Sequence, residues 1–528
     1  MEHIPIIKTV SGFRHCLDTL GSRVPAPIPP ANLSSQLGKL GLVPTMGALH
    51  SGHLSLIERA RQENEKLVVS IFVNPLQFSA AEDFKTYPQP LERDVQLCQD
   101  LGVDVVFAPS VEVILPESVI TQVVPPPHLT ERLCGQSRRG HFTGVATIVM
   151  KLLQIVQPDR AYFGEKDAQQ LCILRRLAQD LNLPVQIVPG KTVRESTGLA
   201  YSSRNQYLTP DQRQQAALLY QSLLAARQLF QAGECDRTPL LAKVEQILAQ
   251  EPQIQLEYVD LVDPVTLQPL NEIQQQGLLA IAAQIGKARL IDNISLDRRR
   301  PIVAIDGPAG AGKSTVTRRC AQALGLQYLD TGAMYRAVTW LVLEQGIDLH
   351  DSLAIADLVE QCVIDLQADP DPQQPPQVWV NQQEVTQVIR SPRVTAQVST
   401  IAAQAAVRTA LLKQQQRFGE QGGVIAEGRD IGTHVFPEAG LKIFLTASIV
   451  ERARRRQQEL ATDQVPEVTL TELIETIATR DQKDSERALA PLRKAYDAIE
   501  INTDGLSIEQ VIDQIMAIYQ DRFCTPAH

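Results

Sequence analysis

The segment 301–315, PIVAIDGPAGAGKST, constrains the fold more than any other part of this 528-residue chain. Its residues 302–305 are a short apolar run, typical of a buried parallel strand. Residues 307–314 match G-x-x-x-x-G-K-[S/T], a pattern whose glycines let backbone N–H groups curl around phosphate oxygens. With the helical pattern at 316–324, the segment predicts a nucleotide-binding α/β domain.

The side chains of this loop predict its chemistry. Lys313 is placed to reach the outer phosphates of ATP, and the hydroxyl of Ser314 is a ligand for Mg²⁺. A glycine-rich turn without function is the alternative, which the flanking strand and helix disfavour. We therefore predict that ATP is bound by Gly307, Pro308, Ala309, Gly310, Ala311, Gly312, Lys313, Ser314 and Thr315.

Length and composition set the wider frame. A chain of 528 residues is too long for one core, and 44% hydrophobic with 21% charged residues is typical of a globular enzyme. The net charge of −10 disfavours nucleic acid and anionic membranes as partners of the whole chain. The eight cysteines form no C-x-x-C pair, and we find no signal peptide and no apolar run of about 20 residues. We therefore expect a cytoplasmic protein without disulfides or structural zinc.

Strand-like and helical segments alternate between residues 42 and 188, which predicts a parallel α/β sheet. A long helix at 211–231 and strands at 257–262 and 278–282 predict a small separate domain. The polar, basic segment 293–300 is expected to be an exposed connection. We assign residues 1–192 to a Rossmann-like α/β domain, 193–295 to a small α+β domain, 296–300 to a linker and 301–528 to the phosphate-loop α/β domain.

His50 and His53 stand in the sequence HSGH, between a predicted strand and a predicted helix. Open α/β sheets bind ligands at such positions, and two imidazoles at a helix N-terminus can hydrogen-bond a triphosphate as pyrophosphate leaves. A metal pair is one alternative, although no third His or Cys lies nearby in the sequence. Two histidines with a purely structural role are the other.

Three further segments of the first half carry polar groups that suit small anionic substrates. FVNPLQF (72–78) ends a predicted strand with amides, GEKD (164–167) places a cation between carboxylates, and SSRN (202–205) offers hydroxyls and a guanidinium. Each alone is compatible with a solvated loop. Together, PTMGALHSGH, FVNPLQF, GHFTGVATIV, QPDRAYFGEKDAQQL, GLAYSSRNQYL and RLIDN resemble pantothenate synthetase, also called pantoate–β-alanine ligase, over residues 5–295.

That family is similar to class I aminoacyl-tRNA synthetases in its HxGH loop and Rossmann-like sheet. The resemblance implies two steps: the pantoate carboxylate attacks the ATP α-phosphate to give pantoyl adenylate and pyrophosphate, and the amine of β-alanine then displaces AMP. It also implies Mg²⁺ with ATP and a homodimer formed through the ligase domain. The segment 22–37 departs from the family as an insertion and carries no implied catalytic residue.

The resemblance also implies roles for single residues. His53 is the family's proton donor or a stabiliser of phosphate charge, His50 stands beside it, and Lys166 faces the α-phosphate. Pantoate contacts fall on Gln77 and Gln170, with Gln77 also near β-alanine. ATP contacts fall on Met46, Gly47, Ala48, Leu49, His50, Ser51, Gly52, His53, Gly164, Glu165, Lys166, Asp167, Val193, Tyr201, Ser202, Ser203 and Arg204.

The second half carries motifs for a nucleotide acceptor. DTGAMYR (330–336) follows the helix of the phosphate loop, and EGRD (427–430) ends a predicted strand. Arg480, Asp484 and Arg487 are spaced for one helical face, where a surface salt-bridge ladder is the alternative. The basic run 452–456 is expected to form a lid whose arginines cover the transferred phosphate, with nucleic-acid binding as its alternative.

IDGPAGAGKST, LDTGAMYRA, VSTIAAQAAVR, EGRDIGTHVFPEA and PLRKAYDA resemble bacterial cytidylate kinase from residue 301 to the end of the chain. The resemblance implies phosphorylation of CMP or dCMP by ATP, with Lys313 and Asp430 in catalytic positions. Thr331 stands where the family more often has serine, and His434 where it has a small or apolar residue. CMP contacts are implied for Thr331, Arg336, Ser399, Arg408, Arg429, Asp430, Arg480, Asp484 and Arg487.

We therefore predict two enzymes on one chain. A regulatory P-loop switch would need an N-K-x-D motif, and the sequence contains no Asn-Lys pair. A degenerate ligase half acting as a scaffold is disfavoured by the intact His50, His53 and Lys166. A P-loop kinase with a different acceptor remains the alternative for the second half.

Overall fold

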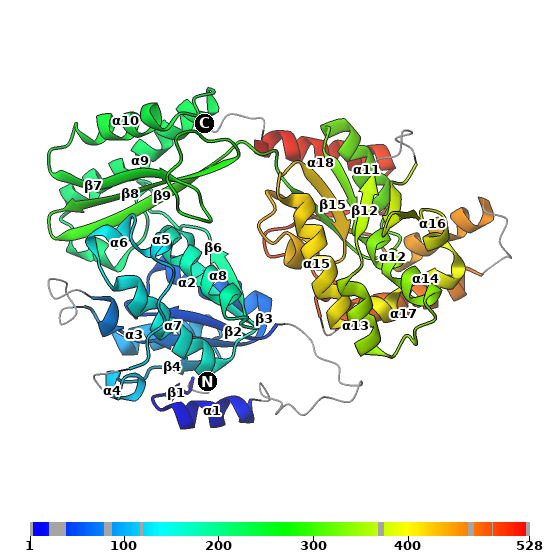
Figure 1. The fold of residues 1–528 in the computed structure, drawn as a ribbon, viewed down its shortest axis with the longest axis horizontal. Helices are drawn as coiled ribbons and strands as arrows, with labels where there is room; N and C mark the ends of the chain where they lie inside the picture. The colour runs from blue at the N-terminus through cyan, green and yellow to red at the C-terminus, as the bar shows by residue number, and fades with distance from the viewer. Residues whose placement is uncertain are drawn as a thin grey trace. The chain divides into compact units, whose positions relative to one another are not determined.

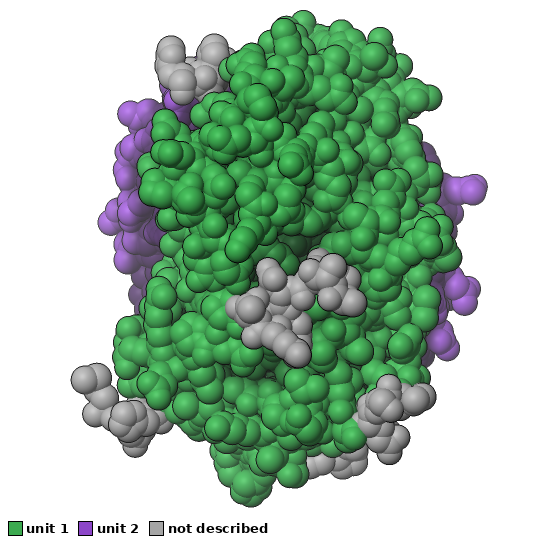
Figure 2. All heavy atoms as spheres, turned by 90° about the vertical axis from the view of Figure 1, so that its left-hand side faces the viewer, with its two compact units in different colours: residues 1–29, 38–298 green, residues 30–37, 299–528 purple. Residues whose placement is uncertain are grey.

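The structure is a computed structural model that describes residues 4–20, 38–78, 87–116, 120–367, 374–462, 469–487 and 489–523. These residues form two compact units, one ending at Arg298 and the other beginning at Arg299, coloured green and purple in Figure 2. The predicted insertion 22–37 lies outside the described residues. No helix within these ranges is long and apolar enough to cross a membrane.

The first unit is built on a six-stranded parallel sheet (Figure 1). Its central strands are apolar and buried between two clusters of side chains, as expected for a parallel sheet covered on both faces. The predicted α/β fold is therefore confirmed. In spatial order the strands are β1 (Ile6–Ile7), β4 (Val105–Phe107), β3 (Asn64–Ile71), β2 (Gly38–Thr45), β5 (Arg160–Gly164) and β6 (Gln186–Gly190).

Side chains from helices complete the two hydrophobic clusters that cover the faces of this sheet. Ile57 on α2 and Cys98 on α3 pack in one cluster, whereas Phe13 on α1, Val149 on α7 and Leu174 on α8 pack in the other. The longer helices are α1 (Val10–Thr19), α2 (Ser51–Glu63), α3 (Leu91–Asp100), α7 (His141–Val156) and α8 (Ala168–Asp180), and the short ones are α4 (Val111–Ile114), α5 (Pro127–Thr130) and α6 (Cys134–Ser137).

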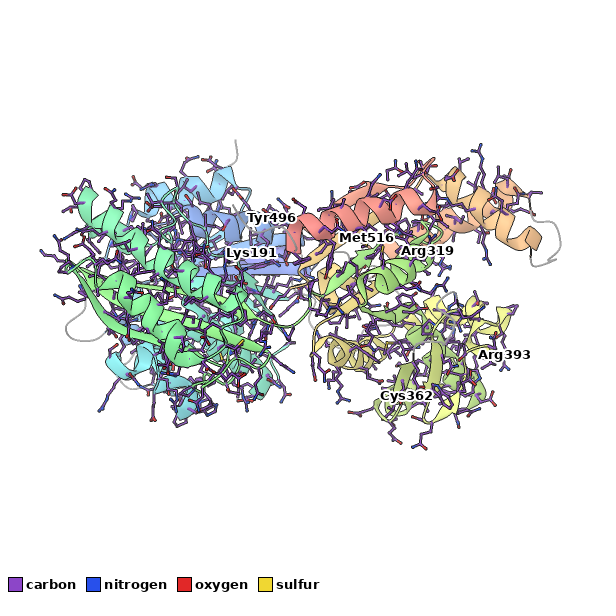
Figure 3. All side chains as sticks on the ribbon, turned by 90° about the horizontal axis from the view of Figure 1, so that it is seen from above. Lys191, Arg319, Cys362, Arg393, Tyr496 and Met516 are labelled. Atoms are coloured by element: carbon purple, nitrogen blue, oxygen red, sulfur yellow. The ribbon has the colours of Figure 1, made fainter. Side chains whose placement is uncertain are left out.

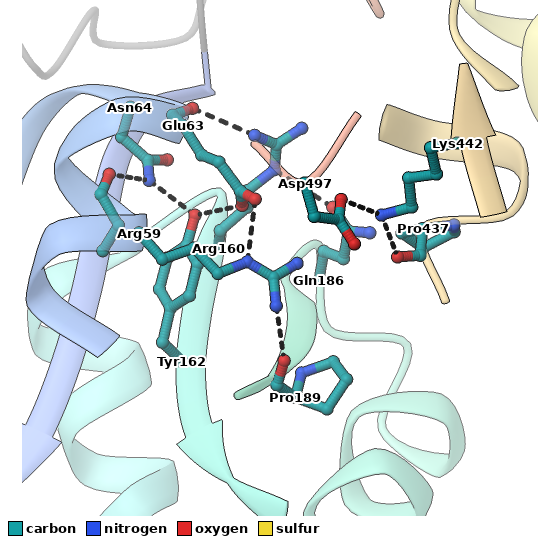
Figure 4. A network of polar contacts seen from close by, with 11 residues as sticks. Arg59, Glu63, Asn64, Arg160, Tyr162, Gln186, Pro189, Pro437, Lys442 and Asp497 are labelled. Carbon is teal, nitrogen blue, oxygen red and sulfur yellow. Dashed lines mark hydrogen bonds and ion pairs between the residues drawn. The ribbon is translucent and has the colours of Figure 1, made fainter. Parts of the chain in front are cut away.

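A buried polar network fixes the C-terminal end of α2 to the sheet (Figure 4). Tyr162 on β5 is fully buried; its hydroxyl donates to Glu63 at 2.9 Å and accepts from Nδ2 of Asn64 at 2.7 Å. Arg160 donates to the backbone oxygen of Glu63 and to Gln186 on β6. These hydrogen bonds tie the C-terminal end of α2 to β5 and β6, and α2 carries HSGH at its other end.

A smaller α+β domain completes the first unit. Its antiparallel sheet has the order β7 (Ile254–Val262), β8 (Gln276–Ile285) and β9 (Ala288–Asp297). The helices α9 (Pro210–Gln231) and α10 (Arg237–Leu248) cover one face and bury Leu223, Val244 and Leu279. Thr209 caps α9 through a reciprocal capping box with Gln212, directly before Pro210, which is why the long helix begins there.

The predicted connection between the units is partly wrong. Residues 293–297, expected to be an exposed linker, are the end of β9. Their polar character is that of a strand with one buried face, because Ile294 and Leu296 are buried while Ser295 between them is exposed. The sequence pattern was too short to separate such a strand from a loop.

Of the arginines that follow β9, Arg298 is hydrogen-bonded to the first unit and Arg300 to the second. Arg298 donates from its guanidinium to the carbonyl oxygen of Ile273 at 3.2 Å and from its N–H to that of Gln275 at 2.8 Å. Arg300 donates to the carbonyl oxygens at the C-terminal end of α11 (Lys313–Leu324). The chain thus passes from one unit to the other between Arg298 and Arg299.

The second unit is a five-stranded parallel sheet with helices on both faces. Alternate residues of its strands enter two clusters: Ile305 packs with α11 and α18, and Ala304 with α12 and α15. Arg319, which is labelled in Figure 3, lies on α11. It pairs with Glu509 on α18 at 2.8 Å. The strands in order are β11 (Gln327–Asp330), β15 (Val424–Gly428), β10 (Val303–Asp306), β16 (Leu441–Thr446) and β17 (Ile499–Asn502); the helices are α12 (Thr331–Glu344), α15 (Ala405–Gly419) and α18 (Ile508–Phe523).

The second unit contains two smaller substructures besides this sheet. One is an antiparallel sheet of β12 (Ile364–Gln367), β13 (Gln377–Val380) and β14 (Gln383–Glu384) with α13 (Ser352–Glu360) and α14 (Pro392–Ala402) nearby in the chain. The other is a pair of helices, α16 (Ile449–Thr462) and α17 (Leu470–Ser485), with a small core of its own formed by Ala453, Leu473 and Ile477. This helix pair contains the basic run 452–456.

Candidate functional sites

The two histidines of HSGH form a single hydrogen-bonded unit at the N-terminus of α2. His50 is the N-cap residue, and its Nδ1 accepts from the N–H of Gly52 at 3.2 Å. Nδ1 of His53 accepts from the N–H of His50 at 3.4 Å, and the two rings stack with centroids 4.0 Å apart. Because Nδ1 accepts in both rings, each neutral imidazole carries its proton on Nε2.

The surroundings keep both imidazoles neutral. Burial, followed by the charge of Lys166, lowers the pKa of His50 to about 4. Burial also lowers the pKa of His53 well below its usual value, and His50 and Lys166 act in the same direction. The pair therefore offers two Nε2–H donors rather than two positive charges. No group of three His, Cys, Asp or Glu side chains in the described ranges is arranged to hold a metal ion.

The loop before the histidines is held by a buried carboxylate that the sequence analysis missed. Asp94 on α3 is 1% exposed, and its two oxygens accept from the N–H groups of Ala48 at 2.8 Å and Leu49 at 2.9 Å. Ala48 has φ = 51°, a conformation that a non-glycine residue rarely adopts without such support. The only sequence signal for Asp94 was an acidic residue in the first turn of a helix.

Gln77 is oriented by its neighbours. Its Nε2 donates to Sδ of Met46 at 2.8 Å, and its Oε1 accepts from Nδ2 of Asn74 at 3.1 Å. The backbone oxygen of Gln77 accepts from Arg138 at 3.1 Å and lies 2.7 Å from Nδ1 of His141. The motif FVNPLQF thus supplies both Gln77 and Asn74, the amide that orients it.

Lys166 lies in a short turn (Glu165–Asp167) between β5 and α8. Its Nζ is 3.5 Å from the carbonyl oxygen of Tyr201 and 3.9 Å from a carboxylate oxygen of Asp167. Lys166, Gln169 and Gln170 line one pocket. The side chain of Gln169 is buried and bonded to backbone atoms. The other residues of that pocket include Arg138, His141, Asp292 and Asn293.

Tyr201 joins the third predicted segment to the histidines. Its ring stacks on His50 with centroids 6.2 Å apart, and its N–H donates to the carbonyl oxygen of Val193 at 3.0 Å. Ser202 caps the turn that contains Ser203 and Arg204. The structure therefore brings HSGH, Lys166 and the start of the SSR segment together.

In the second unit, the phosphate loop connects β10 to α11 as predicted. Gly307 has φ = 150°, and a Cβ there would lie 2.1 Å from the carbonyl oxygen of Leu445, so only glycine fits. Nζ of Lys313 donates to the carbonyl oxygens of Gly307 and Pro308, both at 2.7 Å. Burial, followed by the charge of Arg429, lowers the pKa of Lys313 well below its usual value. The lysine is thus bonded to its own loop.

Ser314 is connected to a buried acid that the sequence analysis did not single out. Its Oγ donates to Glu427 at 3.0 Å, and the hydroxyl of Tyr328 donates to the other oxygen of the same carboxylate. Burial raises the pKa of Glu427 to about 7. Thr331 donates to the backbone oxygen of Glu427 at 2.7 Å. The sequence signal for Glu427 was its place in the EGRD motif. Glu427 lies near the end of β15, which pairs with β10, the strand that leads into the phosphate loop.

The acceptor motifs converge on a cluster of guanidinium groups. Arg408 pairs with Asp430, Arg429 pairs with Asp484 at 2.9 Å, and Arg336 donates to Thr395, one helical turn before Ser399 on α14. Burial, followed by a neighbouring arginine, lowers the pKa of Arg480 and of Arg487. The buried Nε atoms of three of these side chains have no acceptor among the described residues: Arg408, Arg480 and Arg487.

One detail of the sequence prediction was wrong. Arg487 does not share a helical face with Arg480 and Asp484, because α17 ends at Ser485. Within the basic run, Arg452 is 3% exposed, forms two bonds with Asp481 at 3.0 and 2.5 Å, and donates to the carbonyl oxygen of Ala309 in the phosphate loop at 3.1 Å. The predicted lid stays a prediction. The spacing of residues in the sequence predicted neither that α17 ends at Ser485 nor that Arg452 pairs with Asp481.

Comparisons with known proteins agree with these two assemblies. The pantoate-beta-alanine ligase family model matches residues 26–295, and the cytidylate kinase model matches residues 303–521. A bifunctional pantoate ligase/cytidylate kinase of Acaryochloris marina is 65% identical over 99% of each chain, and one of Trichormus variabilis is 60% identical over 92% of each chain. The crystal structure of pantothenate synthetase from Thermus thermophilus covers 55% of this chain and 99% of its own, with 44% identity and a TM-score of 0.50.

Fold and sites together define a two-enzyme chain, a nucleotide-dependent ligase followed by a P-loop kinase. The chain belongs to the family of bifunctional pantoate ligase/cytidylate kinases. Both predicted activities are thereby confirmed, and neither a regulatory P-loop switch nor a scaffold is favoured.

Proposed function

We propose that the ligase makes pantothenate through pantoyl adenylate. A carboxylate is a poor electrophile until one oxygen becomes a leaving group, and transfer of AMP from ATP supplies it. The pantoate oxygen forms a bond to the α-phosphorus as pyrophosphate leaves; the β-alanine amine then attacks the acyl carbon, loses a proton and displaces AMP. The proximity of HSGH, Lys166 and Tyr201 carries this proposal.

In this proposal the histidines act as neutral donors. Their Nε2–H groups hydrogen-bond the phosphates from the N-terminus of α2, where the helix dipole adds positive potential. The charge of Lys166 acts on both His50 and His53 by lowering their pKa values, and the same charge balances the negative charge that develops at the α-phosphate. His53 serves here as a hydrogen-bond donor rather than as the acid implied by the family resemblance, because burial keeps it unprotonated before ATP binds.

For the kinase we propose CMP and dCMP as acceptors. The unpaired Nε atoms of Arg408, Arg480 and Arg487 are buried donors that an anionic acceptor would satisfy. Asp430 and Asp484 orient two guanidinium groups by ion pairs and leave hydrogen-bonding capacity for the nucleoside. Thr331 and Ser399 contribute hydroxyls. Lys313 exchanges its backbone acceptors for the outer phosphates of ATP.

Mg²⁺ is the proposed cofactor of both activities. In the kinase, the hydroxyl of Ser314 and the carboxylate of Glu427 are adjacent oxygen donors of the kind that Mg²⁺ prefers. The ion would neutralise phosphate charge and hold the β- and γ-phosphates together. Tyr328 and Ser314 keep the Glu427 carboxylate in place through hydrogen bonds to its two oxygens.

We also propose a homodimer through the ligase domain and a cytoplasmic location. The first rests on the family resemblance. The second is supported by the seven cysteines without a disulfide in the described part of the chain, which suit a reducing compartment.

One purified preparation tests the catalytic proposals. With ATP and Mg²⁺, pantoate should release pyrophosphate without β-alanine, and addition of β-alanine should yield pantothenate and AMP. CMP and dCMP should each yield ADP. Pyrophosphate release that strictly requires β-alanine would contradict a free adenylate step, and UMP or AMP as the better acceptor would contradict the kinase proposal.

A further inference from the structure

Two consecutive residues at the end of the first unit, Asp292 and Asn293, reach two different segments of the ligase site. They lie on β9 in the small domain, within the motif RLIDN. Successive side chains of a strand point to opposite faces, so one dipeptide can contact two segments at once. Neither residue is among those that the sequence implied as substrate contacts.

Asn293 is bonded to the peptide groups directly before and directly after Lys166. Its Nδ2 donates to the carbonyl oxygen of Glu165 at 3.0 Å and to that of Lys166 at 2.9 Å. An amide nitrogen has two hydrogens, so both are used. The turn that carries Lys166 has no side-chain cap of its own, and Asn293 fixes it from another domain.

Asp292 holds Asn293 in place. The carboxylate is buried and receives two bonds from Arg194, at 2.6 and 2.9 Å, while one of its oxygens accepts from the N–H of Asn293 at 2.8 Å. Arg194 in turn stacks on the ring of Tyr220 at 3.4 Å. A two-bond Arg–carboxylate pair in a buried position defines its geometry closely. Arg194 also follows directly on Val193, the residue that accepts from the N–H of Tyr201.

We propose that Asn293 is a positioning residue of the ligase: it sets the backbone from which Lys166 projects toward the α-phosphate. The inference rests on the proposed role of Lys166. Asn293 itself lines the same pocket as Lys166 and Gln170, but it acts through the lysine. Displacing a catalytic cation by about 1 Å is enough to slow a positioned reaction by up to a hundredfold.

The test measures pantoate-dependent pyrophosphate release by the full-length chain. Asn293→Ala should lower kcat about ten- to hundredfold and change the KM for pantoate less than about twofold, because the lysine acts on the developing charge. Asn293→Asp should be slower still, since it keeps the size but places a carboxylate against two carbonyl oxygens. Ser295→Ala, an exposed position on the same strand, is the control and should retain the rate. CMP kinase activity of each variant measures the amount of full-length chain and normalises the ligase rates.

A double-mutant comparison shows whether Asn293 acts through Lys166. In a Lys166→Ala background, Asn293→Ala should add less than about a twofold loss, because the group it positions is gone. An equal loss in both backgrounds, or full activity of Asn293→Ala, would overturn the proposal. If the lysine variant is too slow for this comparison, hydrogen exchange decides instead: amides of residues 164–170 should exchange at least about tenfold faster in Asn293→Ala and at the original rate in Ser295→Ala. Unchanged exchange would likewise overturn it.

These outcomes are separable from failure of the underlying function. A chain that releases no pyrophosphate with pantoate, or a Lys166→Ala variant with the full rate, would contradict the proposed ligase site. The exchange measurement on residues 164–170 would still report whether Asn293 holds the turn.

Discussion

The two nucleotide-binding loops of this chain are held in contrasting ways. In the ligase, Asp94 from α3 binds the loop backbone, and N–H groups of HSGH itself occupy Nδ1 of His50 and His53, which leaves Nε2 for a ligand. In the kinase, the charged groups that would contact the nucleotides are themselves bonded to protein atoms. Lys313 is bonded to Gly307 and Pro308.

The two sites differ in which existing hydrogen bonds and ion pairs must break or change when a nucleotide binds. The Nε2–H donors of His50 and His53 are already oriented, so a phosphate can bind to them without breaking the hydrogen bonds at Nδ1. In the kinase, Lys313 must release two carbonyl oxygens, and Arg429 and Asp484 must accommodate an acceptor within an existing ion pair. We therefore expect the kinase to show the larger structural change on binding its substrates.

Lys313→Ala should have the largest effect and should distinguish the two loops most clearly, because it should abolish one activity and leave the other unchanged. The variant loses the cation for the outer phosphates of ATP, so CMP phosphorylation should fall below detection, by more than about 10³-fold. Pantothenate formation should be unchanged, and ADP formation with CMP is the measurement. A kinase that tolerates the substitution would show that residues 301–315 are not its phosphate site.

His53→Ala tests the other loop. Removal of one oriented donor at the leaving phosphates should lower ligase turnover by about 10²–10⁴-fold. CMP phosphorylation by the same preparation is the control. His53→Asn retains a hydrogen-bond donor near that position and should keep more activity than alanine. Near-normal pantothenate formation by the alanine variant would remove His53 from the mechanism.

The sequence predicted what depends on local pattern. The strand, glycines and lysine of the phosphate loop are adjacent in the chain, so their geometry follows from residue types and spacing. HSGH was predictable for the same reason. Helix α9 was also predictable within a residue, because Thr209, Pro210 and Gln212 together define where it begins.

Contacts between distant segments were not predictable in this way. Asp94 and Asn293 act on loops 45 and about 130 positions away, and nothing in their local sequence names a partner. The basic run 452–456 predicted a lid over the transferred phosphate, but nothing in its local sequence indicated that Arg452 pairs with Asp481. The end of β9 was taken for a linker because a strand with one exposed face is half polar.

Asp484 probes the ion pairs that distinguish the kinase site. If its carboxylate also binds the acceptor ribose, Asp484→Ala should raise KM for CMP at least about fivefold more than KM for dCMP, because only CMP offers a 2′-hydroxyl. Initial rates with both acceptors measure the ratio. Asp484→Asn separates the roles, since it loses the ion pair with Arg429 but retains a hydrogen-bonding side chain. Equal losses with CMP and dCMP would place Asp484 outside the ribose site.

The smallest effect is expected where the chain passes between the units. Arg298 is bonded to the first unit and Arg300 to the end of α11, whose other end carries Lys313, so fragments 1–298 and 299–528 should each keep their activity within about threefold of the intact chain. The matched fragment 301–528 lacks the arginine at the C-terminus of α11. It should lose about 1 kcal/mol of stability and melt about 2–4 °C lower. The activities and Tm values of the three fragments are the measurements.

A loss of activity above about tenfold in fragment 1–298 or 299–528 would show that the site in that fragment depends on the other unit. The contrast between the two loops would then no longer be a property of each unit alone.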